Sequence, residues 1–301
     1  MSELRISRTI VGTEAGPLAH PIDARWLMAY AAGLGEQDGR YYDTLRPGGP
    51  VAHPLFSVCY EWPLALELRA KALEADVAPR GVHATHHVVI HRPPRAGDTL
   101  LTSACIAAIA RRRSGTLVTT RFTTVDERGA PVTTTDHGSI YRGVDCDEEA
   151  SVGHPSVGAW TTRRGHRADA PADTPGTGQV RWTDAVPVAA GAAHVYTECA
   201  RIWNPIHTDI AVAKSVGLPG LILHGTATLA LAVSRVVARD LDGDAAPVRE
   251  IAGRFTGMVL MPSTFTVRGL STFPDGRIAF DAMDAEGGAA LGDAWIAGRG
   301  R

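Results

Sequence analysis

Residues 225–240 read GTATLALAVSRVVARD, a stretch that is apolar almost all round when it is wound into a helix. A helix without a polar face is stable only when other elements cover it. Four stretches with the composition of β-strands follow it, at residues 248–258, 263–272, 277–284 and 290–298. We therefore expect a buried helix packed against a sheet, which is an α+β arrangement.

The first half of the chain has the same order of elements. Residues 22–35 place apolar side chains on one helical stripe, and residues 53–74 read as a long, mostly apolar helix with boundaries limited by Pro54 and Pro63. The stretches that follow alternate as in an antiparallel sheet with one wet face; they are residues 82–92, 99–110, 115–126 and 131–142. In the second half, residues 191–203 suit the matching first helix, and residues 207–216 suit a short one.

The two halves also align residue by residue. Setting Gly35 against Arg201 places GEQDGRYYD (35–43) on RIWNPIHTD (201–209). The alignment pairs Glu36 with Ile202, Asp38 with Asn204, Tyr41 with His207, and Asp43 with Asp209. Residues 50–54 then match 222–225, and residues 96–100 match 261–265. The common order of these matches indicates a duplication. A linker rich in Pro, Gly, Asp and Thr, residues 163–179, separates the halves.

Composition narrows the class of protein. The chain has 301 residues, enough for two domains of about 150 each. With 45% hydrophobic residues and a net charge of -2, it has no global basic field for nucleic acid or an anionic membrane. Its four cysteines form no CxxC pair, which argues against a zinc site and a redox motif. We see no signal peptide at the N-terminus and no run of about 18–20 apolar residues, so we expect a cytoplasmic protein.

Two short motifs precede the helix at 225–240. Residues 203–207 read Trp-Asn-Pro-Ile-His, and His224-Gly225 follows seventeen positions after His207. A histidine with an unperturbed pKa of about 6.5 accepts and donates protons near neutral pH. The N–H groups in the first turn of a helix lack internal partners and suit an anionic oxygen. These motifs therefore fit two interpretations: proton transfer beside a helix N-terminus, or a structural histidine with a glycine that permits close packing.

This segment resembles the active-site segment of the MaoC-like hydratases (hydratase 2 family), which add water to enoyl thioesters or remove it. The duplicated order of elements is similar to the double-hotdog members of that family. The resemblance implies an α+β double hotdog, with two antiparallel sheets each wrapped around a long central helix. We expect an N-terminal hotdog over residues 1–150, a linker over 151–180, and a C-terminal hotdog with the hydratase-like motif over 181–301.

The resemblance also implies roles for individual residues. His207 takes the acid–base position, and a backbone N–H near Gly225 polarises the thioester carbonyl. Asn204 fixes the turn or contacts substrate, and Trp203 packs in the fold or forms a wall of an acyl pocket. Asp209 orients His207, caps a helix or faces solvent, and His224 lines the site or holds the loop. The substrate would be an acyl-CoA or an acyl-carrier-protein thioester, and the implied reaction is an (R)-specific hydration or dehydration.

One feature departs from the family pattern, which is roughly Gly-Asp-x-Asn-Pro-x-His. The Gly and Asp positions hold Arg201 and Ile202, and isoleucine cannot transfer protons. Glu198, Asp209 and Glu36 are the candidate replacements. Two alternatives to hydration therefore stay open: a specialised lyase, cyclase, isomerase or thioesterase that uses His207, and a non-catalytic hotdog that binds acyl groups.

The sequence gives no indication of a cofactor. Gly-rich segments such as residues 217–220 lack the strand–GxGxxG–helix context of a dinucleotide site. His83, His86, His87 and His91 are close in sequence, but alternation in a strand would place His86 on the face opposite to the other three. We expect no metal. A fused pseudo-dimer is compatible with either a monomer or a homodimer.

Overall fold

The computed structural model describes residues 4–152 and 178–298. The first half is built from two long helices and a sheet, in the order β1 (Arg5–Ile6), η1 (Arg8–Ile10), β2 (Glu14–Pro21), α1 (Ala24–Gly33), η2 (Gly39–Tyr41), α2 (Ser57–Ala72), η3 (Ala78–Arg80), β3 (Gly81–Ile90), β4 (Thr99–Arg112), β5 (Gly115–Asp126), β6 (Pro131–Arg142), β7 (Asp145–Cys146) and β8 (Ala150–Ser151). The second half repeats this plan, as β9 (Trp182–Val188), α4 (Ala192–Ala200), η4 (Pro205–His207), α5 (Ile210–Ser215), α6 (Gly225–Asp240), β10 (Val248–Phe255), β11 (Ser263–Thr272), β12 (Ile278–Met283) and β13 (Ala289–Gly298).

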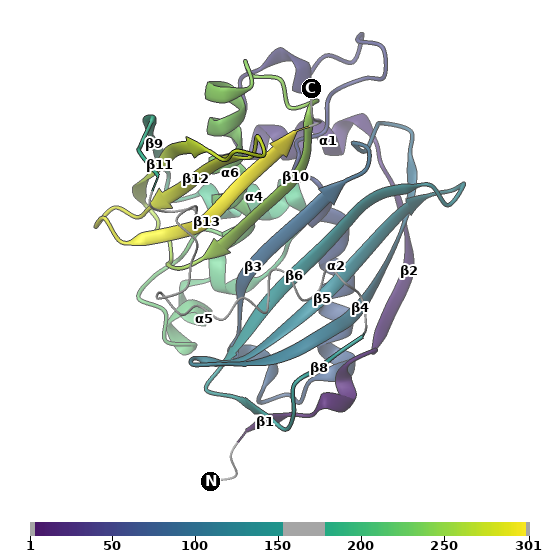
Figure 1. Cartoon of the computed structure of the whole chain (residues 1–301), viewed down its shortest axis with the longest axis vertical. Coiled ribbons are helices and arrows are strands. Elements are labelled where there is room, and N and C mark those ends of the chain that lie inside the picture. Colours follow the sequence, from purple (N-terminus) through teal and green to yellow (C-terminus); the bar gives the residue numbers. More distant parts are fainter. Residues whose placement is uncertain (1–3, 153–177, 299–301) are drawn as a thin grey trace.

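Most strands of both halves join into one antiparallel sheet, while β1 and β7 form a separate parallel pair. Among the described residues the sheet has the order β2-β4-β5-β6-β3-β10-β13-β12-β11-β9, with β8 paired to β4. In Figure 1 the sheet lies in front, with α2 behind the strands of the first half and α6 behind those of the second. The two predicted sheets are therefore connected edge to edge, through β3 and β10. Each half keeps its own central helix, as the sequence predicts.

The register between β3 and β10 shows a pseudo-twofold axis. Val89 pairs with Glu250 and Thr85 pairs with Arg254, so each pair converts into the other when every residue is moved by 165 positions. His87 and Ala252, which pair directly, are themselves 165 positions apart and mark the axis. Twofold dimer interfaces have the same self-complementary pairing, in which equivalent residues exchange partners. The register therefore supports the predicted duplication.

The contact between α1 and α4 follows the same symmetry. The rings of Tyr30 and Tyr196, which are 166 positions apart, lie 5.9 Å from each other between centroids. A Cβ atom on Gly33 would lie 2.8 Å from the Cβ atom of Cys199, again 166 positions away. Glycine is thus needed at 33, because a side chain there would collide with α4. The two first helices pack across the axis and hold the halves together.

The turns after α1 and α4 match in detail. Glu36 N donates to Ala31 O, and Ile202 N donates to Thr197 O. Each bond spans five residues and is typical of the Schellman motif at the end of a helix. Gly35 and Arg201 both have a positive φ, of 72° and 59°. Further on, Oδ1 of Asp43 and Oδ1 of Asp209 each accept from the backbone N–H groups two and three residues later. The predicted alignment of residues 35–43 with 201–209 is therefore confirmed.

Burial of apolar side chains explains why α2 and α6 are central. Eight residues of α6, from Ala227 to Val237, are buried, as the apolar pattern of this segment predicts. The α2 helix buries Leu64 and Leu68 but also Glu61, a carboxylate inside the fold. Tyr30, Tyr60 and Phe265 are among the largest fully buried side chains. No helix among the described residues is long and apolar enough to cross a membrane.

Two edge strands and one strand face were not predicted correctly. The β2 and β9 strands lie at the two ends of the sheet, and the prolines within them obscured the strand pattern. The predicted faces of the histidines in β3 are wrong for His83, because the register shifts between His83 and Thr85. This shift brings the ring of His83 within 5.5 Å of that of His86. The linker predicted at 151–180 lies mostly outside the described residues, so the domain boundaries stay a prediction.

Candidate active site

The end of α4 sets the position of the motif residues. Arg201 closes the helix in the left-handed conformation, with φ 59° and ψ 36°. Glycine adopts this conformation most easily, and this is the position of glycine in the family pattern. The Arg201 guanidinium lies 4.0 Å from the centroid of the Trp26 ring on α1. A cation–π contact of this kind contributes about 0.5–1 kcal/mol at an exposed site and offsets part of the backbone strain. The turn is thus kept although its glycine is absent.

The ring of His207 is held in one tautomer. His207 ends η4, is 8% exposed, and its Nδ1 lies 2.9 Å from the backbone carbonyl oxygen of Ile222. A carbonyl only accepts hydrogen bonds, so Nδ1 carries the proton and Nε2 keeps a free lone pair. Burial lowers the pKa of His207 to about 4, although the hydrogen bond to Ile222 acts in the opposite direction. At neutral pH the ring is therefore an uncharged base with Nε2 available.

His224 lies directly against His207. The two ring centroids are 3.7 Å apart and the rings are stacked at 26°. Nε2 of His224 is 3.2 Å from the hydroxyl oxygen of Thr197, on the last turns of α4. Burial, together with the nearby His207, lowers the pKa of His224 well below its usual value. His224 thus supports the ring of His207 from one side and stays neutral.

The N-terminus of α6 lies beside these rings. His224 is the N-cap residue of α6, and no side chain caps the first turn. The N–H groups there have the partial positive charge of a helix N-terminus. A Cβ atom on Gly225 would lie 3.3 Å from the ring of Phe255, so glycine leaves a narrow gap at this point. These features fit the oxyanion role that the resemblance implies for Gly225.

No carboxylate in the described part of the chain hydrogen-bonds or ion-pairs with His207. Ile202, at the acidic position of the pattern, is 4% exposed and belongs to the main hydrophobic core. Glu198 is exposed on α4, and Asp209 is occupied as the N-cap of α5. Glu36 belongs to the first half and accepts a hydrogen bond from Ser234 of α6. None of the three candidate replacements therefore completes an acid–base pair with His207 in this conformation.

The structure shows where three other predicted site residues lie, namely Trp203, Asn204 and Asp209. Trp203 is 58% exposed, so it is not packed in the core. Asn204 precedes η4, but its side chain makes no capping hydrogen bond, so the turn does not depend on one. Asp209 accepts from the N–H groups of Ala211 and Val212, which favours the capping role over the orientation of His207. Their part in binding a substrate stays a prediction.

Sequence reasoning missed several polar and aromatic partners of this site. Thr197 and Tyr196 come from the preceding helix, and Tyr196 donates to the hydroxyl of Thr226 at 3.0 Å. Phe255 comes from the end of β10. Thr197 stands ten residues before His207, and this spacing gives no signal by itself. Only the packing of α4 on the loop before α6 brings these side chains together.

The histidines of β3 make different contacts. The rings of His83 and His137 are 3.8 Å apart between centroids, and burial lowers the pKa of His137 to about 3. His87 faces elsewhere, with Nε2 2.6 Å from Glu250. No group of three or more His, Cys, Asp or Glu side chains in the described residues is placed to hold a metal ion. Their four cysteines are likewise free, without disulfides.

The fold places the chain in a known structural class. A MaoC-like dehydratase from Phytophthora capsici superposes with a TM-score of 0.79 at 24% identity, covering 96% of both chains. Full-length peroxisomal multifunctional enzyme type 2 from Drosophila melanogaster superposes with a TM-score of 0.73 at 21% identity, covering 95% of this chain and 48% of that one. The chain is thus a double-hotdog protein.

Family models match a segment in each half of the chain. Residues 174–273 match the model described as "MaoC like domain", and residues 9–135 match "FAS1-like, dehydratase domain region". The second half of the chain therefore contains a MaoC-like domain, and the first half matches a dehydratase domain region.

Its curated relatives match over short segments. The chain is 39% identical over 62 residues to peroxisomal enoyl-CoA hydratase 2 of Arabidopsis thaliana, which is 21% of this chain and 20% of that protein. It is 41% identical over 76 residues to fatty acid synthase subunit beta of Aspergillus oryzae, which is 25% of this chain and 4% of that protein. The chain thus spans only a small part of either relative.

Proposed function

We propose that this protein hydrates enoyl thioesters, or dehydrates the corresponding (R)-3-hydroxyacyl thioesters, carried by CoA or by an acyl carrier protein. The observation that carries the proposal is the fixed tautomer of His207 beside the uncapped first turn of α6. The relatives named enoyl-CoA hydratase 2 and fatty acid synthase subunit beta support the substrate class. We further propose the (R) configuration of the hydroxyacyl group and CoA or an acyl carrier protein as the carrier.

In the proposed mechanism, Nε2 of His207 first accepts a proton from water. The hydroxyl oxygen then bonds to the β-carbon of the enoyl group, and the electrons of the double bond move toward the thioester carbonyl. Backbone N–H groups at the start of α6 hold the resulting enolate oxygen. His207 returns the proton from Nε2 to the α-carbon, which ends the addition. The low pKa of His207, about 4, makes its protonated form a strong acid and favours this return.

A single base explains both proton transfers, but it lacks help in orienting the water. An acidic side chain would normally hold the second hydrogen of that water, and Ile202 offers none. General acid–base assistance by one positioned group contributes about 10²–10⁴-fold in rate. We therefore expect turnover that is slow for this class of enzyme.

A second candidate function follows from the same feature. Ile202 makes the acidic position of the pocket apolar, which suits a reaction of an acyl thioester that needs only one base. Cyclisation, isomerisation or thioester hydrolysis at His207 would each meet this condition. Binding of acyl groups without catalysis is the outcome if no turnover is found.

The test is a panel of thioesters of different chain lengths. Enoyl and 3-hydroxyacyl thioesters of CoA and of phosphopantetheine are incubated with the protein, and the enoyl absorbance and the products are followed. Conversion between the enoyl and 3-hydroxyacyl forms supports the first function, and its absence across the panel rules it out. Products of ring closure, double-bond migration or hydrolysis would instead support the second.

A further inference from the structure

The N-terminal half contains a cavity of about 430 Å³, away from the motif histidines. It lies between the loop before α2 and the segments that follow β3 and precede β10. Most of its wall is apolar, and sites that bind small molecules in proteins have volumes of about 300–1,000 Å³. The cavity therefore has the size and the lining of a binding site.

The pseudo-twofold axis relates this cavity to the proposed active site. Ile90, which lines the cavity, ends β3, and its equivalent 165 positions later is Phe255, which ends β10. Phe255 fills the space next to Gly225. The smaller Ile90 leaves the corresponding space open. The two sites are distinct. His53, which lines the cavity, contacts Ser234 on α6. Ser234 is nine residues after Gly225, which is about 13 Å along the helix axis.

The inner end of the cavity is polar. Ser57, at the start of α2, lines the cavity and is 2% exposed. Its hydroxyl makes no short hydrogen bond among the described residues, and its nearby partner is the carboxyl of Glu61, whose pKa it acts to lower. One turn later lies the buried carboxyl of Glu61, which accepts from Thr135 at 2.5 Å. Burial raises the pKa of Glu61 to about 7. The matching helix α6 buries no carboxylate, so the fold does not require one here.

The imidazole of His53 forms a rigid part of the wall. Leu55 N donates to Nδ1 of His53, so the proton of the neutral ring lies on Nε2, which faces the Ser234 hydroxyl at 3.2 Å. Ser234 in turn donates to Glu36. Burial lowers the pKa of His53 to about 3, so this chain of hydrogen bonds does not change near neutral pH. The wall is thus preorganised, which reduces the cost of binding.

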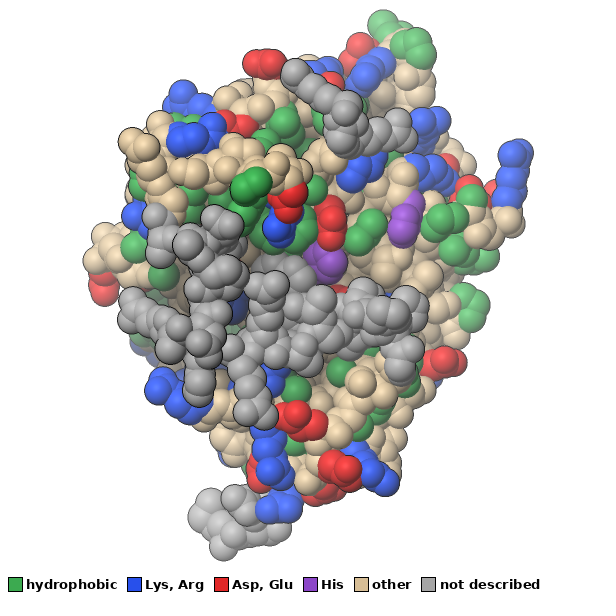
Figure 2. Space-filling model, viewed as in Figure 1, with side chains coloured by type: hydrophobic (Ala, Val, Ile, Leu, Met, Phe, Trp, Pro, Cys, Tyr) green, Lys and Arg blue, Asp and Glu red, His purple; other side chains and the backbone are tan. Residues whose placement is uncertain are grey.

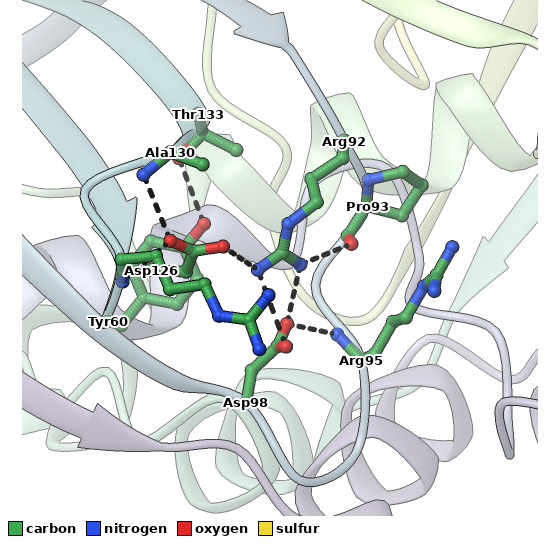
Figure 3. Close-up of polar contacts among 9 residues, drawn as sticks. Tyr60, Arg92, Pro93, Arg95, Asp98, Asp126, Ala130 and Thr133 are labelled. Atoms are coloured by element: carbon green, nitrogen blue, oxygen red, sulfur yellow. Dashed lines mark hydrogen bonds and ion pairs between the residues drawn. The ribbon is translucent and has the colours of Figure 1, made fainter.

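Two arginines line the solvent side. Arg95 is exposed and Arg46 is half-buried. Figure 3 shows that the neighbouring Arg92 is held by Asp98 and Asp126, whereas the side chain of Arg95 points away from this network. Within the described part of the chain, neither Arg46 nor Arg95 has an ion pair like that of Arg92. Positive charge at the entrance of an apolar cavity attracts an anionic group.

We propose that this cavity is a second ligand site, for an aliphatic chain with an anionic group at one end and a hydroxyl or carbonyl oxygen toward the other. The chain lies along the apolar wall, the inner oxygen hydrogen-bonds to Ser57, and the anion lies at Arg46 and Arg95. Oxygenated fatty acids and their CoA thioesters both have this chemistry. The site does not depend on the reaction at His207.

The test measures binding to the full chain by calorimetry, with 8-hydroxyoctanoic acid, octanoic acid and 8-hydroxyoctanoyl-CoA as probes. The hydroxy acid should bind about threefold to tenfold more tightly than octanoic acid, and Ser57→Ala should remove that preference. Ile90→Phe, which copies the other half, should weaken all three probes at least tenfold. A CoA thioester that binds more tightly than the free acid would identify the thioester as the ligand, and the reverse would identify the acid.

Two further variants test the cavity if Ile90→Phe is poorly folded. The double variant Arg46→Gln, Arg95→Gln alters only the solvent side and should weaken binding of the free acids, whereas His207→Gln should leave it unchanged. No binding of any probe overturns the proposal. Binding that is lost in His207→Gln and unchanged in Ile90→Phe also overturns it, because the probes would then occupy the motif site.

Discussion

Placing an acidic side chain at residue 202 tests whether the active site lacks a group that holds the water activated by His207. Ile202 follows the turn that ends α4 and is 4% exposed. In Ile202→Asp, a carboxylate would stand at the acidic position of the family pattern, close to the stacked rings of His207 and His224. We expect it to hold the water that His207 activates, and so to raise the hydration rate.

The magnitude follows from two opposing effects. Assistance by a positioned acid–base group is worth about 10²–10⁴-fold in rate, which is about 3–5 kcal/mol of activation free energy. Removing a buried isoleucine side chain lowers the free energy of unfolding by about 2–5 kcal/mol. The variant should therefore be more active and less stable, and it should be assayed well below its melting temperature.

The assay compares Ile202→Asp with Ile202→Asn. Asparagine has nearly the same size and loses the same packing, but it does not accept a proton. Initial rates of hydration of a short enoyl thioester, followed by enoyl absorbance, should rise only in the aspartate variant. Equal rates in the two variants would contradict a role for the carboxylate, because the effect would then come from the altered shape of the pocket.

Two further predictions concern the glycine and the buried histidine. Gly225→Ala adds a methyl group 3.3 Å from the Phe255 ring, so it should lower kcat/KM on the order of 10²-fold by displacing the reacting carbonyl, while circular dichroism stays unchanged. The folded-state pKa of His207 is about 4 and the unfolded value about 6.5, so its contribution to stability is complete above pH 6.5 and is lost as pH falls to 4. Denaturant titrations should show a loss of stability over this range that is about 3 kcal/mol smaller in His207→Gln; an equal loss in both proteins would contradict the assigned pKa.

Much of the fold could be predicted because the sequence patterns of its two halves reinforce each other. The apolar segment at 225–240 coincides with α6, and the strands after it begin within one residue of the predicted positions. Local rules failed where the environment decides. Prolines at 17 and 21 occur in β2 because it is an edge strand with few partners to satisfy. The irregularity after His83 reverses the faces of a strand, and alternation alone cannot reveal it.

Part of the site could be predicted because three of its residues lie in short local motifs. The motif identified His207, His224 and Gly225, and the structure brings these three together. It could not reveal Thr197 or Phe255, because these residues reach the site through the packing of whole helices and strands. The duplication places Glu36 away from His207, and in the structure it accepts a hydrogen bond from Ser234 of α6. Residues brought together by tertiary packing leave no local signal in the sequence.

The proton transfer proposed for His207 is tested by the effect of His207→Gln on kcat/KM for enoyl thioester hydration. Glutamine keeps a hydrogen-bonding side chain but does not exchange protons near neutral pH. We expect kcat/KM to fall about 10²–10⁴-fold, while Tyr41→Phe, at the equivalent position of the other half, should change it less than about twofold. Retention of wild-type activity in His207→Gln would contradict the proposed proton transfer.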